Sequence, residues 1–408
     1  MKIVLIDTVY GFGSTGKIVE TLHSNLKKDG HDVKSFYGRG AIVSQEGVIK
    51  ISADFEVFID AILSRLTGFT GIFSWIATAK MIGLLEIFKP DIVHVHEVHG
   101  YYINYYKIFE YLKKKDIPII WTLHCESAYT GRCGYAFDCE QWKISCVKCP
   151  SITTYPKSLF FDRSSSQFQK KQILFSSINK IVFAPVSNWL NNRFKQSFVK
   201  MKKSRVVYNG INTKDLFYPR DVKDLVNSHN LANRHVVLSV APDLMSEIKG
   251  GKWVLKIAEK LEHLPVTFIM IGVKEKISEL PDNVICLPPI KDQNKLAEYY
   301  SLADIYMLTS ERETFSLTCA ESLACGTPVI GFNSGGPLEV APEPFGLFVN
   351  YGAVDQMISL IEKSVNGHLN LADAKQCRVH AVNSFSNEMM YESYKSLYMD
   401  MLKPNFIY

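Results

Sequence analysis

Two glutamates, Glu313 and Glu321, flank a segment whose chemistry suits the binding of a phosphorylated sugar. A polar loop ends at the first of them. An apolar periodic stretch then predicts a helix over 315–325, which Gly326 and Pro328 end. The first N–H groups of a helix have no partner within it and can hold a phosphate. The carboxylates on either side of this anion site predict hydrogen bonds to the hydroxyls of a sugar and a ribose joined to that phosphate.

A lysine earlier in the same half of the chain can neutralise such a phosphate. Lys249 lies beside two glycines at a predicted strand-to-helix turn, after the strand expected over 235–241. Its ammonium group is a compact point charge that suits a diphosphate. A solvated turn would have the same sequence. The phosphate-binding interpretation of the lysine is favoured because the lysine precedes the two glutamates in the same predicted sheet. The turn Asn209-Gly210 lies near the expected hinge, where a linker turn is the alternative interpretation.

Four histidines lie at the ends of two predicted strands in the first half of the chain. His124 ends the strand expected over 118–123, where a side chain points into the ligand crevice of a parallel sheet, and a structural cap is the alternative. His94 and His96 share one face of a strand, and His99 lies beyond its end. We expect these three to line a cleft, with satisfied core histidines as an equal alternative. Their spacing could suggest a metal site, but His99 lies beyond the strand end and no further ligand is evident, so we favour the cleft.

A glycine-rich loop follows the first predicted strand. With Gly11, Gly13 and Gly16 it matches the GxGxxG pattern of dinucleotide binding, but the end of the second strand lacks the carboxylate that this pattern requires. Arg39 at that end can suit a 2′-phosphate, so dinucleotide binding is weakened rather than excluded. It also matches the P-loop pattern through Lys17, but Ile18 replaces the hydroxyl that binds Mg²⁺. Two interpretations are favoured equally, a tight strand-to-helix turn or a loop that approaches the phosphate of a ligand or an acceptor, and dinucleotide binding stays open as a minor third.

Four cysteines, Cys133, Cys139, Cys146 and Cys149, lie in one predicted loop. Four thiolates with one close C-x-x-C pair suit tetrahedral zinc, and we expect this metal to pin the loop rather than to take part in chemistry. The N-terminus has no signal-peptide pattern, so a cytoplasmic location is expected, where thiols stay reduced. Free reduced cysteines are therefore the main alternative, and disulfides would require another compartment.

Short apolar strands alternate with helical patterns along the 408 residues. This alternation predicts an α/β protein with two doubly wound, Rossmann-like domains and with ligand sites at the carboxyl ends of the strands. We expect domains over 1–205 and 206–385, and a C-terminal helix over 386–408 that packs back on the first domain. The expected strands are 2–7, 91–95, 118–123 and 181–186 in the first sheet, and 235–241, 266–271, 283–287, 304–308 and 328–332 in the second.

Composition and charge favour a globular protein without a nucleic-acid partner. The net charge is +5 and 47% of the residues are hydrophobic, so the chain is only mildly basic. Four charged residues interrupt the apolar stretch from Val57 to Phe88, which predicts a core helix, or else a membrane-surface helix, rather than a membrane span. The basic, aromatic stretch from Tyr155 to Lys180 can approach lipid headgroups, although a solvated helical face is the commoner explanation.

Four segments together resemble the retaining glycosyltransferases of family 4 with the GT-B fold. They are PDIVHVHEVHGYY, WTLH with the cysteine loop, VVYNGIN, and ERETFSLTCAESLACGTPVI, which is a form of the family's E-x7-E signature. The match covers nearly the whole chain in the right order, and it is closest to the branch that builds capsular, colanic-acid-type or lipopolysaccharide sugars. The resemblance implies two domains that face a central cleft, and a UDP- or GDP-sugar as donor.

The resemblance also implies roles for the polar side chains. Glu313 would contact hydroxyls of the donor sugar, Glu321 would bind the ribose, and His124 would sit beside the donor sugar. Lys249 would help to hold the diphosphate. Members usually place an arginine a few residues before this lysine, and this chain has none there.

The remaining implied roles belong to the backbone. The amides of Phe315, Ser316 and Leu317 would hold the diphosphate, and the first glycine loop would border the reaction centre. We assign Asn209, Gly210 and Gly13 to the donor site as well. The branch often has His-Asp where this chain has His124-Cys125-Glu126, which puts a carboxylate role at that position in doubt.

The implied reaction moves a hexose-type sugar, with retention, to a lipid-linked or growing glycan, in the cytoplasm or at the inner face of the plasma membrane. No cofactor is expected for the transfer, because the leaving phosphate would take the acceptor's proton. Two alternatives belong to other classes. One is an NAD(P)-dependent oxidoreductase that uses the first glycine loop, and the other is a non-catalytic subunit that binds a sugar nucleotide.

Overall fold

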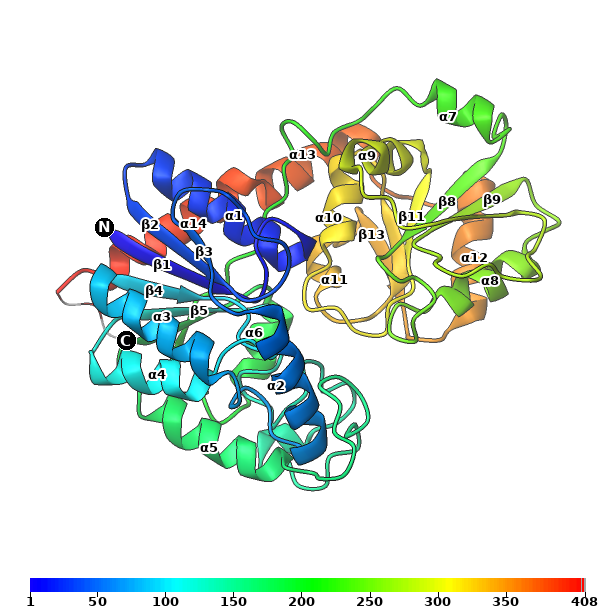
Figure 1. The fold of residues 1–408 in the computed structure, drawn as a ribbon. Coiled ribbons are helices and arrows are strands. Elements are labelled where there is room, and N and C mark those ends of the chain that lie inside the picture. The colour runs from blue at the N-terminus through cyan, green and yellow to red at the C-terminus, as the bar shows by residue number, and fades with distance from the viewer. Residues whose placement is uncertain (405, 407–408) are drawn as a thin grey trace. The chain divides into compact units, whose positions relative to one another are not determined.

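The computed structural model describes residues 1–404 and 406, which form two α/β units (Figure 1). The first unit comprises Met1–Val207 with the described residues from Tyr391 onward, and the second comprises Tyr208–Met390. Each unit is built on one sheet of parallel strands, which confirms the predicted doubly wound α/β class.

The first unit contains a seven-stranded sheet. Its strands are β1 (Lys2–Asp7), β2 (Asp32–Tyr37), β3 (Val48–Lys50), β4 (Ile92–Val95), β5 (Ile119–Leu123), β6 (Ile181–Pro185) and β7 (Lys203–Ser204). The order across the sheet is β3-β2-β1-β4-β5-β6-β7. β4, β5 and β6 are buried along their whole length, as expected for a parallel sheet with helices on both faces. The order reverses between β1 and β4, so the ligand crevice of this unit is expected at their carboxyl ends.

Helices surround this sheet (Figure 1). They are α1 (Gly13–Lys28), α2 (Asp54–Thr67), α3 (Trp75–Phe88), α4 (Tyr105–Lys114), α5 (Ser164–Ser176) and α6 (Asn188–Phe194), with a 3-10 turn over Gln141–Lys143. α1 packs against β1 and β2, and α4 packs between α3 and α5. The long connection between β5 and α5 carries the four loop cysteines.

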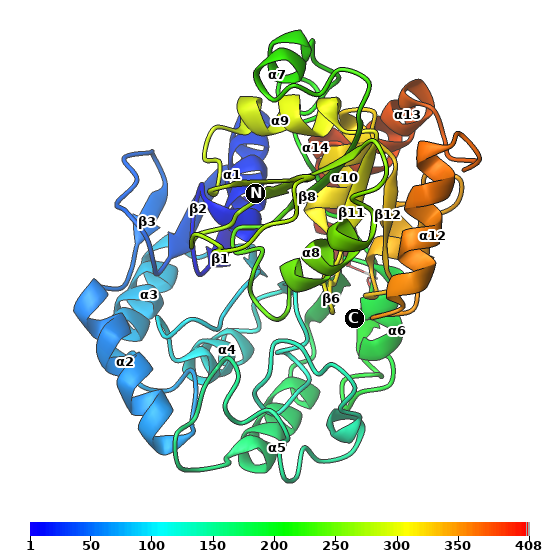
Figure 2. The ribbon, with the colours of Figure 1, turned by 90° about the vertical axis from the view of Figure 1, so that its right-hand side faces the viewer.

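The second unit contains a six-stranded parallel sheet. Its strands are β8 (His235–Val240), β9 (Val266–Ile271), β10 (Val284–Leu287), β11 (Ile305–Leu308), β12 (Val329–Phe332) and β13 (Gly346–Val349), in the order β10-β9-β8-β11-β12-β13. Its helices are α7 (Lys223–Ser228), α8 (Gly251–Lys260), α9 (Gln293–Leu302), α10 (Leu317–Ala324), α11 (Pro337–Val340), α12 (Val354–Val365) and α13 (Ala374–Phe385). α8 packs on α12, and α10 packs on α9 and α13 (Figure 2). Here the order reverses between β8 and β11.

The C-terminal helix α14 (Asn387–Met401) contacts the first sheet through buried hydroxyls. The hydroxyl of Tyr398 lies 2.6 Å from His94 Nδ1, and His94 Nε2 lies 2.7 Å from Thr122 Oγ1, which also contacts the hydroxyl of Tyr394 at 2.7 Å. Burial lowers the pKa of His94 to about 3, so this ring stays neutral. His94 is thus a satisfied core histidine rather than part of a cleft.

The apolar stretch from Val57 to Phe88 forms two helices, α2 and α3. The prediction of a core helix was wrong for α2, because its buried residues are Glu56, Asp60 and Ser64, whereas five of its large apolar side chains are exposed. Periodicity could not give this result, since a stripe of apolar residues indicates which side chains share a face but not what covers that face.

None of the helices that the structure describes combines the length and the hydropathy needed to cross a bilayer. The helix predicted over 386–408 begins at Asn387 and ends at Met401, and residues 405, 407 and 408 lie outside the described part of the chain.

The Tyr398–His94 hydrogen bond leads to a prediction about stability. Tyr398→Phe removes the partner of a fully buried ring nitrogen, so the free energy of unfolding should fall by about 1–3 kcal/mol. Urea denaturation followed by tryptophan fluorescence would measure it. Tyr155→Phe, at a tyrosine that is 52% exposed, should change the value by less than about 0.5 kcal/mol. Equal urea midpoints for the two variants would contradict the stabilising role of the hydrogen bond between α14 and His94.

Candidate functional site

In the second unit, a lysine and a glutamate meet after the two strands between which the sheet order reverses. Lys249 lies in the turn between β8 and α8, and Glu313 lies in the loop between β11 and α10. Lys249 Nζ lies 2.5 Å from Glu313 Oε1, and both side chains keep partial access to solvent. The contact lies at the carboxyl ends of the strands, where doubly wound sheets bind ligands, and the roles expected for the two residues stay predictions.

The backbone around Glu313 is fixed by the glycine-rich loop after β12. The Glu313 N–H donates to the Ser334 carbonyl at 2.9 Å, and the Gly336 N–H donates to the Glu313 carbonyl at 3.0 Å. A Cβ at position 336 would lie 2.2 Å from the Thr314 carbonyl oxygen, so only glycine permits this close approach. Two hydrogen bonds to the loop after β12 thus hold the backbone of Glu313 in place.

The helix after Glu313 begins two residues later than the sequence predicts. Ser316 is its N-cap, with φ of 83°, and its Oγ accepts from the Cys319 N–H at 3.4 Å. A left-handed conformation is unusual for serine, and it turns the chain sharply into α10. Leu317 is then the first helical residue, so the N–H groups from Phe315 to Leu317 lie at the N-terminal end of α10, where an anion is favoured.

Aromatic packing joins this helix start to the first residues of the second unit. The buried ring of Phe315 lies 6.0 Å from Tyr208 and 5.5 Å from Phe385 between ring centroids. Asn209, the next residue, is buried, and its Oδ1 has no hydrogen-bond partner among the described residues. An unpaired buried acceptor is costly, so it is a candidate contact for a ligand hydroxyl.

Gly210 has a structural explanation instead. Its N–H lies 3.1 Å from Met390 Sδ, and a Cβ there would come within 2.9 Å of Asn387 Cα. The close approach of α14 therefore requires glycine.

Glu321 lies on α10 and is half-buried. Its Oε2 accepts from the Tyr300 hydroxyl at 2.9 Å, a bond between α10 and α9 that the sequence did not predict. Burial, with the nearby Glu321 charge, raises the pKa of Tyr300 well above its usual range, so the hydroxyl remains a donor. This bond orients the carboxylate.

In the first unit, polar groups collect after the three adjacent strands β1, β4 and β5. Asp7 ends β1, Glu97 follows β4, and His124 follows β5. The Glu97 N–H donates to Asp7 Oδ1 at 3.1 Å. His124 Nε2 lies 3.0 Å from His96 Nδ1, with the two rings stacked. The sequence predicted His124 in this crevice, and it missed Asp7 and Glu97.

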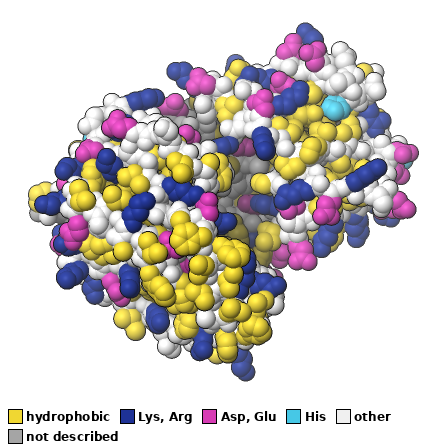
Figure 3. Space-filling model, viewed as in Figure 1, with side chains coloured by type: hydrophobic (Ala, Val, Ile, Leu, Met, Phe, Trp, Pro, Cys, Tyr) yellow, Lys and Arg dark blue, Asp and Glu magenta, His cyan; other side chains and the backbone are white. Residues whose placement is uncertain are grey.

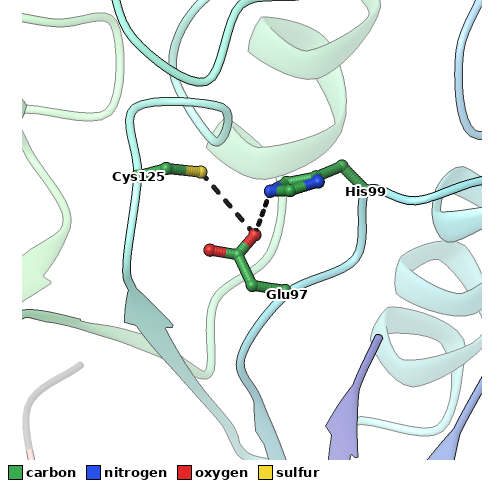
Figure 4. Close-up of side chains that lie close together, drawn as sticks. All are labelled: Glu97, His99 and Cys125. Atoms are coloured by element: carbon green, nitrogen blue, oxygen red, sulfur yellow. Dashed lines mark hydrogen bonds and ion pairs between the residues drawn. The ribbon is translucent and has the colours of Figure 1, made fainter. Parts of the chain in front are cut away.

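Glu97, His99 and Cys125 point toward one another (Figure 4). Among residues 1–404 and 406, they are the one group of three or more His, Cys, Asp or Glu side chains whose ligand atoms all lie within 4.8 Å of one another. The His99 ring forms an ion pair with Glu97, and Cys125 Sγ lies 3.6 Å from the same carboxylate. The ion pair alone accounts for the arrangement without a metal.

Burial sets the charges of this cluster. It lowers the pKa of His124 to about 4 and that of His96 well below its usual value, so both rings are neutral near pH 7. Burial alone would also lower the pKa of His99, but the Glu97 carboxylate outweighs it and holds His99 protonated. Burial, with the Glu97 charge, raises the pKa of Asp7 to about 7.

Gly13 begins α1 in the first unit, with φ of 66°, and a Cβ there would meet nothing within 4 Å. The loop closes through a hydrogen bond from the Gly11 N–H to the Gly16 carbonyl at 3.0 Å. This geometry fits the tight strand-to-helix turn, and the assignment of Gly13 to a donor site in the second unit stays a prediction.

The four loop cysteines line one small cavity, together with Trp142 and Arg132. None of them forms a disulfide. In the part of the chain that the structure describes, no three of their sulfur atoms lie within 4.8 Å of one another, so the loop does not present a closed tetrahedral site. Burial raises the pKa of Cys133 to about 12 and that of Cys146 to about 11, which keeps these thiols protonated unless a cation binds.

The residues that sequence reasoning missed had a usable signal. Asp7 and Glu97 each lie at the carboxyl end of a predicted parallel strand, the same rule that identified His124. Tyr300 had no such signal, because a tyrosine in an amphipathic helix is as common in a core as in a site.

Comparisons with known proteins match both halves of the chain. The family model for Glycosyltransferase Family 4 matches residues 15–215, and the model for Glycosyl transferases group 1 matches residues 222–377. A protein of Escherichia coli K12 described as a putative colanic acid biosynthesis glycosyl transferase, WcaC, is 24% identical over 324 residues, which cover 76% of this chain and 77% of that protein.

Solved structures share the fold. Sucrose-phosphate synthase from Thermosynechococcus elongatus has a TM-score of 0.69 and 18% identity, and the alignment covers 98% of both chains. Anabaena HepE in complex with UDP has a TM-score of 0.66 and 14% identity, over 98% of this chain and 100% of that one. At these identities the likeness establishes the architecture alone.

The raised pKa of Asp7 leads to a prediction about pH. Because its pKa is about 7 in the folded chain and 3.8 for the free side chain, folding favours the protonated form, and this stability is lost as pH rises through about 7. The wild type should therefore lose free energy of unfolding between pH 5 and pH 8, and Asp7→Asn should not. The difference between the two free energies should shift in favour of the variant by roughly 2 kcal/mol over this range. Urea denaturation at both values would measure it. The exposed Asp32→Asn should show no such shift, and a pH-independent difference for Asp7→Asn would refute the assignment.

Proposed function

Because the chain belongs to family 4 of the GT-B glycosyltransferases, we propose that it moves a hexose-type sugar from a UDP- or GDP-sugar to a lipid-linked or growing glycan in surface polysaccharide biosynthesis. The observation that carries the proposal is the contact between Lys249 and Glu313 beside the N-terminal end of α10. The similarity to a colanic acid glycosyl transferase supports the glycan acceptor, and a UDP complex with the same fold supports the donor class.

The Lys249–Glu313 pair suggests how the donor would be received. A diphosphate carries more negative charge than one carboxylate, so it would compete for the lysine ammonium. The lysine and the α10 N–H groups would then stabilise the diphosphate. Glu313 would be released to accept hydrogen bonds from sugar hydroxyls, and Glu321, oriented by Tyr300, would accept from the ribose.

The transfer step that we propose retains the configuration at the anomeric carbon. The bond from this carbon to the β-phosphate oxygen breaks, the acceptor oxygen bonds to the same face, and the acceptor's proton passes to the departing phosphate. His124 is neutral near pH 7 and would contact the donor sugar as a hydrogen-bonding group. The step needs no divalent cation, because Lys249 and the helix N–H groups supply the positive charge.

We also propose a structural zinc ion for the cysteine loop. The four cysteines line one cavity, and thiolate ligands would remove the high pKa values that burial imposes on them. Small movements of the loop would be needed to bring the four sulfur atoms into a tetrahedron. The zinc would pin the long connection between β5 and α5 and take no part in transfer.

Donor hydrolysis tests the proposed activity. The purified chain should release UDP or GDP from at least one member of a panel of nucleotide sugars, and Glu313→Gln should lower that rate by about 100-fold with an unchanged melting temperature. Glu311→Gln, two residues earlier on the same loop, is the matched control and should keep nearly full activity.

Other outcomes would identify another class. Tight donor binding without hydrolysis or transfer would indicate a non-catalytic subunit, and NAD(P)H binding without sugar-nucleotide binding would indicate an oxidoreductase. Full activity in a folded Glu313→Gln variant would remove the central argument for the site.

Metal analysis tests the zinc proposal. Mass spectrometry should find about one zinc per chain, and Cys146→Ser with Cys149→Ser should lose it. Cys286→Ser, at a half-buried cysteine of the second unit, should retain the metal. A wild-type chain that contains no metal and whose loop cysteines react freely with a thiol reagent would support reduced cysteines instead.

A further inference from the structure

Helix α2 has its polar and apolar faces reversed. Its buried residues are Glu56, Asp60 and Ser64, spaced four residues apart along one face. The exposed side chains include five large apolar ones, which are Phe55 (61% exposed), Phe58 (65%), Ile59 (48%), Ile62 (37%) and Leu66 (41%). These lie at the spacings of a single helical stripe. A helix on the surface of a water-soluble domain normally has the opposite arrangement.

The inward carboxylates are satisfied by the start of α3. The Ala77 N–H donates to Glu56 at 3.0 Å and 3.2 Å, and the Ser74 hydroxyl donates to Asp60 at 2.5 Å. Ser64 also donates to Asp60, at 2.9 Å. Negative charge at a helix N-terminus is favourable, so these contacts fix which face of α2 lies inside. The outward apolar stripe is therefore a fixed feature of the fold rather than the result of a loosely attached helix.

The stripe continues onto neighbouring segments. The Leu159 N–H donates to the Arg65 carbonyl at the end of α2, at 2.8 Å, which brings the loop with the exposed side chains of Leu159, Phe160 and Phe161 beside the helix. Trp75, at the start of α3, is 61% exposed. We call these residues with the α2 stripe the α2 surface. In Figure 3 hydrophobic side chains gather over this part of the first unit.

Cations border the α2 surface. Arg65 is exposed within the stripe, and the Arg163 guanidinium lies 5.4 Å and 5.3 Å from the ring centroids of Phe69 and Phe161. Lys170 Nζ lies 5.0 Å from the Phe69 centroid. Basic side chains around an apolar centre that contains tryptophan and phenylalanine are typical of helices that lie in a membrane interface.

The exposed carboxylates of these segments are already engaged. Asp54 pairs with Lys50 at 2.6 Å, and Asp162 accepts from the N–H groups of Cys149 and Ser164 at 2.8 Å and 2.9 Å. Backbone N–H groups leave the charge of Asp162 in place, but the cations Arg65, Arg163 and Lys170 outnumber it, so the border of the apolar surface is net positive and favours an anionic partner.

We propose that the α2 surface docks the first unit on an anionic lipid bilayer, with α2 parallel to the membrane and its apolar side chains among the headgroups and upper acyl chains. A helix with an exposed apolar face and a cationic border fits a partner that is apolar inside and negative at its surface. A second copy of this chain does not fit that description, because the chain is basic. The inference rests on the proposed function in one respect, because a lipid-linked acceptor would be held in the same bilayer.

Vesicle sedimentation tests the docking. The full chain should sediment with vesicles of phosphatidylcholine that contain phosphatidylglycerol, bind pure phosphatidylcholine more weakly, and dissociate as salt is raised. Phe55→Ser with Phe58→Ser should lower the partition coefficient by about tenfold or more, because two exposed aromatic side chains leave the interface. Ile87→Ser with Val379→Ser is the matched control, since these residues are 82% and 50% exposed outside the α2 surface.

Several outcomes would overturn the proposal. Equal binding of the two double variants would remove the role of α2, and a wild-type chain that binds neither vesicle would remove the docking itself. Sedimentation velocity can also detect dimers. If the wild type forms dimers and only Phe55→Ser with Phe58→Ser abolishes them, the α2 surface binds a second copy of the chain instead. Donor hydrolysis without vesicles separates this proposal from the activity, because the double variant should hydrolyse the donor at the wild-type rate.

Discussion

The structure depends on the parallel arrangement of its strands. Because helices cover both faces of each parallel sheet, polar side chains that a ligand can reach collect after the strand ends, near the point where the order of the sheet reverses. In the second unit this places Lys249 against Glu313, and in the first it places Asp7 against Glu97. One constraint on backbone burial thus produces both polar clusters, although the sequence motifs around them are unrelated.

The two clusters have opposite electrostatic characters. The Lys249–Glu313 contact keeps partial access to solvent, so an incoming anion can exchange with the carboxylate at little cost in desolvation. Asp7 and Glu97 are buried and His99 is half-buried, and their mutual contacts shift their pKa values. The Lys249–Glu313 contact is therefore suited to exchange with a charged ligand. The cluster of Asp7, Glu97 and His99 is suited to positioning neutral hydroxyls.

The sequence predicted much of the fold because buried parallel strands are continuous apolar runs. It indicated all nine strands that it specified by range, but the edge strands β3 and β7 are only three and two residues long and contain no such run. The predicted helix over 315–325 in fact begins at Leu317, because Ser316 adopts a left-handed conformation that no propensity indicates. The Tyr300–Glu321 bond was equally hidden, since it joins two helices whose relative rotation depends on tertiary packing.

Helix α2 shows where reading a sequence by periodicity fails in principle. An apolar stripe predicts a buried face only if water is the sole solvent. In α2 this rule is reversed, because Glu56 and Asp60 face inward and accept hydrogen bonds from the start of α3. The side chains that remain outside must then be stabilised by something other than the core. A bilayer supplies an apolar phase at the molecular surface, so the same carboxylates that anchor α3 also determine which face of the first unit can meet a membrane.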